Sequence, residues 1–188
     1  MWHFRGYSGN QDQIESFIDS LSGRSAIVAG GAAGVLAEMA EAKGQLDDPV
    51  IFATNDIGKV IKWAHWVSLH PDKFFSPGQA MTHTAFGNGA QFDWRIEPEH
   101  FPLSGYFAMQ LAWIMGCDRI VLCGCPGEAG PRFDGSANEY AGFGYGSGTT
   151  GSDSAVKSML ERTMKRLPEF KAAVRSMSGA TKHFFGGL

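Results

Sequence analysis

A glycine-rich turn follows the first apolar run of the sequence, and it is the first candidate for binding chemistry. The turn is Gly30-Gly31-Ala-Ala-Gly34, directly after the run at 25–29. Glycines there let backbone N–H groups approach a phosphate, and a following helix adds a partial positive charge. The spacing differs from G-x-G-x-x-G and lacks the Lys-Ser/Thr of a P-loop, so a tight turn without a ligand is the alternative.

Two further polar groups stand at the ends of expected elements. Asn55 and Asp56 follow the apolar run at 49–54 and could bond ribose hydroxyls or a base, or cap the next helix. Ser104 and Gly105 open a strongly apolar helix, where Ser104 is a natural N-cap and the following amides form an anion site. The absence of G-x-S-x-G favours binding over nucleophilic catalysis.

His70 is the candidate general acid or base. It follows the run at 65–69 and stands beside Pro71 and Asp72, whose carboxylate could orient the imidazole. His65 begins the same run, and five residues of strand turn the two histidines to opposite sides. They therefore make a poor pair of metal ligands, and packing is the favoured role for His65.

The cysteines are expected to be unbridged thiols without a metal. Cys117, Cys123 and Cys125 are odd in number and lie within nine residues, unlike a disulfide framework spread along a chain. The spacing also lacks the C-x2-C of zinc sites. Cys125 or Glu128 could border a crevice, but nothing nearby in sequence lowers the pKa of the thiol.

These residues need a fold that gathers the ends of several strands. Apolar runs at 25–29, 49–54, 65–69 and 119–123 predict strands, and helical spacing predicts helices over 32–43, 57–63, 106–115 and 154–167. Weaker runs at 81–85 and 91–95 predict two strands with a turn at 87–89, and 172–179 predicts a last strand and turn. We expect an α/β, Rossmann-like, mostly parallel and doubly wound sheet in a single domain over 1–188, with a ligand crevice at the carboxyl ends of its strands.

Glycine is concentrated in one long segment. The chain holds 25 glycines in 188 residues, and the segment 127–151 includes Gly142-Phe-Gly-Tyr-Gly-Ser-Gly148. Such a run is either a linker or a lid over a site. A lid is favoured because structured segments flank it.

Composition narrows the class of protein. Hydrophobic residues make up 44% of the chain and the net charge is −3, which fits a globular domain and offers no electrostatic footprint for general nucleic-acid binding. No apolar stretch reaches the length of a membrane span, and the first residues do not resemble a signal peptide. A cytoplasmic protein without membrane association is expected.

Together the segments resemble a group of Rossmann-like proteins that includes the bacterial sialyltransferases, the motility accessory factors of flagellin glycosylation and the archaeal 6-hydroxymethylpterin diphosphokinases. Besides the glycine turn and Asn55, the resemblance lies in S-G-x-x-A…G-x-x-x-I-x-L-x-G, here Ser104-Gly105-Tyr-Phe-Ala108 with Gly116, Ile120, Leu122 and Gly124. It implies that Gly30, Gly31 and Asn55 meet the nucleotide of an activated donor and that Ser104 and Gly105 line the same crevice. The sialyltransferases have G-N-G-P-S at the turn, so this chain lacks their polar Asn and Ser.

The chain is also similar to small uncharacterised proteins of tailed bacteriophages and prophages. The shared segments are Asn55-Asp56, 65–73, 119–124 and 174–179. This resemblance implies the same fold and a location in the host cytoplasm or in association with the virion. It implies no particular reaction.

The leading functional prediction is the binding of a nucleotide or nucleotide-sugar, with glycosyltransferase-like activity as an extension of it. Transfer would use His70 as base with Asp72 as its orienter, and amides at Gly31 to Gly34 to neutralise the leaving phosphate. The alternative is a non-catalytic phage accessory or virion-associated protein whose exposed aromatics and glycine-rich loop contact a protein partner or a second copy of the chain.

Overall fold

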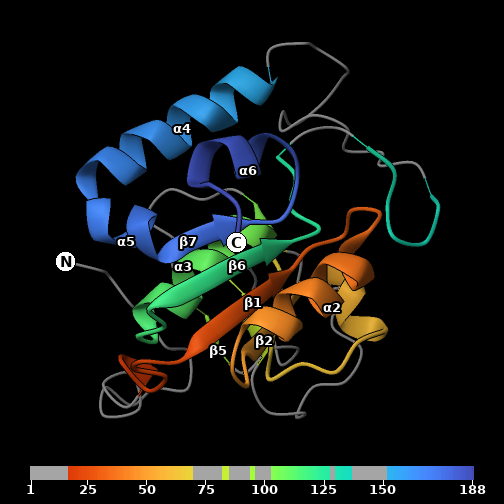
Figure 1. Ribbon diagram of the computed structural model, residues 1–188, viewed down its shortest axis with the longest axis horizontal. Coiled ribbons are helices and arrows are strands. Elements are labelled where there is room, and N and C mark those ends of the chain that lie inside the picture. The colour runs from red at the N-terminus through yellow and green to blue at the C-terminus, as the bar shows by residue number, and fades with distance from the viewer. Residues whose placement is uncertain (1–16, 70–81, 85–93, 96–102, 128–129, 137–151) are drawn as a thin grey trace.

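A parallel sheet forms the centre of the molecule in the computed structural model, which describes residues 17–69, 82–84, 94–95, 103–127, 130–136 and 152–188 (Figure 1). Seven strands pair in parallel in the order β5-β4-β3-β2-β1-β6-β7. They are β1 (Ser25–Ala29), β2 (Val50–Thr54), β3 (His65–Val67), β4 (Thr82–Thr84), β5 (Trp94–Arg95), β6 (Arg119–Cys123) and β7 (Val174–Ser176). The predicted α/β class with a parallel sheet is confirmed.

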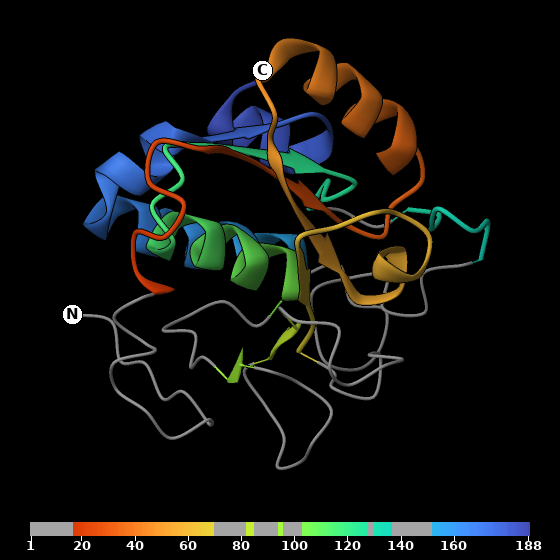
Figure 2. The same cartoon turned by 90° about the horizontal axis from the view of Figure 1, so that it is seen from below.

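Helices cover both faces of the sheet. They are α2 (Val35–Gln45), the 3-10 helix η1 (Asn55–Lys59), α3 (Ser104–Ile114), α4 (Ser152–Arg166), α5 (Pro168–Ala173) and α6 (Gly179–Phe185). Residues of α3 to α6 join one core cluster, and residues of α2 and η1 join the other. Figure 2 shows α2 and α3 on opposite sides of the strands. None of the helices in the described ranges is long and apolar enough to cross a membrane.

The central strands are apolar on both faces, as strands buried between two helical layers must be. In β1, Ala26 and Val28 pack into the core cluster that contains α3, whereas Ile27 and Ala29 pack into the cluster that contains α2. Helix α3 is itself buried on most of its surface, which explains its nearly continuous apolar sequence.

The strand order reverses beside β1. The chain proceeds from β1 to β2 and β3 on one side, and β6 and β7 then pair on the other side of β1. Crossovers that leave a sheet in opposite directions open a crevice above the carboxyl ends of the strands. The segments after β1, β2, β3 and β6 are therefore the segments where a binding site is expected.

Several boundaries differ from the sequence prediction. The helix expected at 57–63 is the short η1, and the segment 168–185 holds two helices, α5 and α6, around β7. Helices of six and seven residues are too short to show a periodic pattern, although Pro168 at the start of α5 is a typical helix-start signal. Strands β4 and β5 pair in parallel, which a tight turn between them could not connect. Residues 87–89 and the glycine run at 142–148 lie outside the described residues.

Candidate functional site

Asn55 lies at the centre of the candidate site and has an unusual backbone. It follows β2 with a φ of 49°, in the left-handed region that few residues other than glycine adopt. The indole Nε1 of Trp66 donates a hydrogen bond of 2.7 Å to the Asn55 carbonyl oxygen. This bond from β3 holds the turn in place, so the side chain of Asn55 projects from a fixed backbone.

The Asn55 side chain joins three elements. Its Oδ1 accepts hydrogen bonds from Ser68 Oγ at 2.7 Å and from Ser104 Oγ at 3.0 Å. Ser104 Oγ in turn accepts the backbone N–H of Leu69 at 3.1 Å. The structure thus brings together two residues that the sequence analysis selected, Asn55 and Ser104, and adds Ser68 to them.

The side-chain nitrogen Nδ2 of Asn55 is the hydrogen-bond donor of this network that has no acceptor among the described residues. With Oδ1 facing two hydroxyls, the NH2 group points elsewhere, and no residue in the described ranges accepts a hydrogen bond from it. Asn55 is half-buried, so this donor remains accessible. It can bond a carbonyl, a ring nitrogen or a phosphate oxygen.

The first turn of α3 adds backbone donors. The helix begins at Ser104 with Leu103 as its N-cap, which corrects the prediction that Ser104 is the cap. The Ser104 hydroxyl is directed to Asn55 instead of to the helix amides. Neither the N–H of Ser104 nor that of Gly105 has an acceptor among the described residues.

The thiol of Cys125 fills the space between the β1 turn and α3. A Cβ built on Gly30 would lie 2.5 Å from Cys125 Sγ, and one built on Gly105 would lie 3.0 Å from it. Burial, and next the Glu38 carboxylate, raise the pKa of Cys125 to about 12. The thiol is therefore a packing group and not an activated nucleophile at neutral pH.

Most backbone N–H groups of the glycine turn already donate hydrogen bonds to carbonyls elsewhere in the chain. Gly30 N–H donates to the carbonyl of Cys123 at 2.7 Å, and Ala32 N–H donates to that of Gly124 at 3.1 Å. Ala33 N–H donates to the carbonyl of Pro131 at 2.8 Å. Within the described residues, the N–H groups of Gly31 and Gly34 are left without an acceptor. The turn thus offers fewer donors to a phosphate than its sequence predicts.

Glu38 places a carboxylate at the same turn. Its Oε2 accepts the backbone N–H of Gly124 at 2.7 Å, which ties the first turn of α2 to the end of β6. A carboxylate is favourable at the amino end of a helix because it opposes the positive end of the dipole. The same charge disfavours a second anion there.

Asp56 forms two ion pairs. One carboxylate oxygen lies 2.7 Å from Lys59 Nζ, and the other lies 2.8 Å from Arg132 Nη2. Arg132 belongs to the segment 130–136, where Phe133 N–H also donates to the Gly31 carbonyl at 3.0 Å. Asp56 therefore anchors this segment over the glycine turn.

The remaining predicted residues divide into two groups. His70 and Asp72 lie outside the described residues. His65 is buried and its ring stacks on Phe52 with centroids 4.5 Å apart, so the predicted packing role is confirmed. Burial lowers the pKa of His65 to about 4.

The three cysteines are unbridged. Cys117 and Cys123 are buried, and burial raises the pKa of both thiols. In the part of the chain that the structure describes, no group of three or more His, Cys, Asp or Glu side chains could hold a metal ion.

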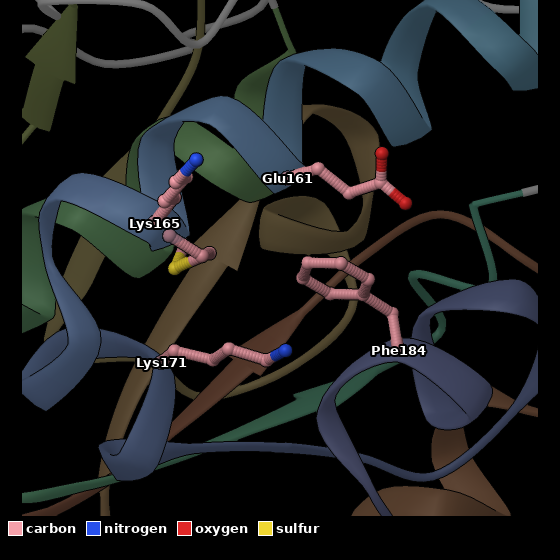
Figure 3. Close-up of a pocket in the computed structure, with 5 residues that line it drawn as sticks. Glu161, Lys165, Lys171 and Phe184 are labelled. Carbon is pink, nitrogen blue, oxygen red and sulfur yellow. The ribbon is translucent and has the colours of Figure 1, made fainter.

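A separate hollow of about 170 Å³ lies between α4, α5 and α6 (Figure 3). Met164 and Phe184 give it apolar walls, and Lys171 Nζ stands 4.5 Å from the centroid of the Phe184 ring. None of the predicted site residues lines this hollow. Its walls come from the helices on one face of the sheet, and not from the turns after β1, β2 and β3.

Sequence reasoning missed four residues of the site, namely Glu38, Trp66, Ser68 and Arg132. The run at 65–69 contains both Trp66 and Ser68, and a polar residue near the end of a buried strand is a usable signal. Glu38 and Arg132 carried no such signal, because their partners are backbone or side-chain groups more than 70 positions away. Comparison with protein-family models, curated proteins and solved structures finds no match for this chain.

Proposed function

We propose that the protein binds a nucleotide or nucleotide-sugar in the crevice above the carboxyl ends of β1, β2, β3 and β6. The observation that carries the proposal is the side-chain NH2 group of Asn55, which has no acceptor among the described residues. Hydrogen bonds from two serines and an indole hold Asn55 in one orientation after β2, one strand away from the position where the strand order reverses. Preorganised donors of this kind recognise a base or a sugar without an ordering cost on binding.

The position of the phosphate is part of the proposal. Three of the five N–H groups of the glycine turn already donate to backbone carbonyls elsewhere in the chain, and the turn faces the Glu38 carboxylate. We therefore place the phosphate at the first turn of α3, beside Gly105 and the side-chain amide of Asn55. Free amides at a helix start favour an anion through both hydrogen bonds and the helix dipole. The resemblance to Rossmann-like sialyltransferases implies a ligand of the same class.

Transferase activity would require one catalytic group in addition to the binding site. The reaction would need a general base, for which His70 with Asp72 is the candidate; His70 directly follows Leu69, whose N–H is bonded to Ser104. His70→Ala should then abolish transfer and leave ligand binding within a few fold. An equal loss of both would assign His70 to binding.

The test is a thermal-shift screen of the full chain with nucleosides, nucleotides and nucleotide-sugars. A ligand at 100 times its Kd should add about 2.7 kcal/mol of stability. Asn55→Asp keeps an acceptor for both serines and removes the donor, and it should eliminate the shift. Gln45→Glu is a matched control, because Gln45 is exposed at the end of α2 and the substitution also converts a side-chain amide into a carboxylate.

The screen also separates the alternative function. If no nucleotide or nucleotide-sugar stabilises the wild-type protein, the proposal fails and a non-catalytic interaction module becomes the better account. The proposal fails as well if a ligand stabilises wild type and Asn55→Asp equally.

A further inference from the structure

Glu38 has a free acceptor at the glycine turn. Its Oε2 is engaged by the Gly124 N–H, and Oε1 would lie 3.9 Å from a Cβ built on Gly34. No residue in the described ranges donates a hydrogen bond to Oε1. One oxygen of the carboxylate is therefore fixed beside the turn, and the other is available to accept a hydrogen bond from a ligand.

The charge of Glu38 and the hydrogen bonds of the turn both disfavour a phosphate at this position. The N–H groups of Ala32 and Ala33 already donate to backbone carbonyls, so a phosphate at the turn would have only those of Gly31 and Gly34 to replace its water. It would also stand within a few ångströms of a carboxylate, where like charges repel strongly in a half-buried site. A neutral hydroxyl meets no such penalty and can donate to Oε1.

We infer that Glu38 sets the orientation of the ligand in the crevice. It excludes phosphate from the glycine turn and accepts a hydrogen bond from an uncharged hydroxyl of the ligand, of the kind carried by a ribose or a donor sugar. This inference rests on the proposed function, because it concerns the same crevice. It reverses the arrangement that the glycine-rich sequence suggests, in which the turn would bind the phosphate.

The test compares Glu38→Gln with Glu41→Gln. Glutamine at 38 keeps the chain length and an oxygen that can accept the Gly124 N–H, but it loses the charge. Glu41 lies one helical turn further along α2, is exposed, and changes the net charge of the protein equally. Binding of pyrophosphate, of a nucleoside and of its diphosphate is measured by calorimetry on the full chain, and thermal melting verifies that each variant is folded.

We expect Glu38→Gln to change the affinities for pyrophosphate and for the nucleoside in opposite directions. Glu38→Gln should bind pyrophosphate about tenfold more tightly than wild type and the nucleoside about tenfold more weakly. Glu41→Gln should match wild type for both ligands. Diphosphate binding that depends on Asn55, together with equal behaviour of the two glutamine variants, would overturn the inference and leave the proposed function standing. If wild type binds neither the nucleoside, nor its diphosphate, nor any nucleotide-sugar of the thermal-shift screen, the proposed function and the inference both fail.

Discussion

The Sγ of Cys125 lies 2.5 Å from the position that a Cβ on Gly30 would occupy. That Cβ would also overlap the carbonyl oxygen of Gly124. The first of these neighbours is a side chain with some freedom to move, whereas the second is backbone at the end of a central strand. Glycine at position 30 is therefore required by the close approach of β1 and β6, whatever binds in the crevice.

Gly30→Ala should destabilise the protein by at least about 2 kcal/mol, because relief of the overlap requires a shift of the backbone after β6. Gly31→Ala is the control, since a Cβ there has no neighbour within 4 Å. Urea unfolding at neutral pH measures both variants. Equal stability of the two would show that the turn can move away from Gly124.

Asn55→Ala should be about 1 kcal/mol less stable than Asn55→Gly. Both variants lose the hydrogen bonds to Ser68 and Ser104, but only alanine is strained at a φ of 49°. The difference in stability between the two variants therefore measures the backbone strain alone. The difference between either variant and wild type also includes the lost side-chain hydrogen bonds. If alanine proves as stable as glycine, the turn relaxes out of the left-handed region once the side-chain hydrogen bonds to Ser68 and Ser104 are lost.

His65 should make stability depend on pH below neutrality. Its pKa is about 4 when folded and about 6.5 when unfolded, so the unfolded state binds the proton first as the pH falls. The contribution is fully present above pH 6.5 and is lost progressively toward pH 4, by roughly 3 kcal/mol in total. His65→Phe, which can still stack on Phe52, should flatten the pH profile of unfolding over this window.

His183→Phe is the control for that measurement, because His183 is exposed. Its pH profile should follow the wild-type curve. A profile of His65→Phe that also follows wild type would mean that other groups, mainly carboxylates, carry the pH dependence.

Asp56→Asn should release the segment 130–136 with little effect on global stability. The variant weakens the ion pairs with Lys59 and Arg132, which are partly exposed and contribute up to about 1 kcal/mol. Hydrogen exchange at the N–H groups of Ala33 and Phe133, which bond across the turn, should accelerate by several fold. Exchange at Ala26 N–H, within β1, should be unchanged; acceleration there would indicate global destabilisation.

The sequence predicted the strands at the centre of the sheet better than the contacts of the site. Continuous apolar runs mark β1, β2 and β6 because these strands are buried on both faces. The position of the turn at Gly30, between a strand and a helix, predicts a phosphate site, with a tight turn without a ligand as the alternative. The structure shows that Glu38 and the Pro131 carbonyl already engage that region. Such long-range partners leave no local pattern, and neither does the left-handed backbone of Asn55.

The pairing of β1 with β6 also has a consequence for how the chain folds during synthesis. Ala29 pairs with Cys123, so one edge of β1 stays unpaired with β6 until residues roughly ninety positions later leave the ribosome. At ribosomal speeds this is a delay of about 5–20 seconds, during which the apolar edge Ala26-Ile27-Val28 can pair only with β2 or with another chain. Parallel sheets of high contact order fold slowly for the same reason. Yield in a cell should therefore depend on temperature and on chaperones that shield this edge until β6 arrives.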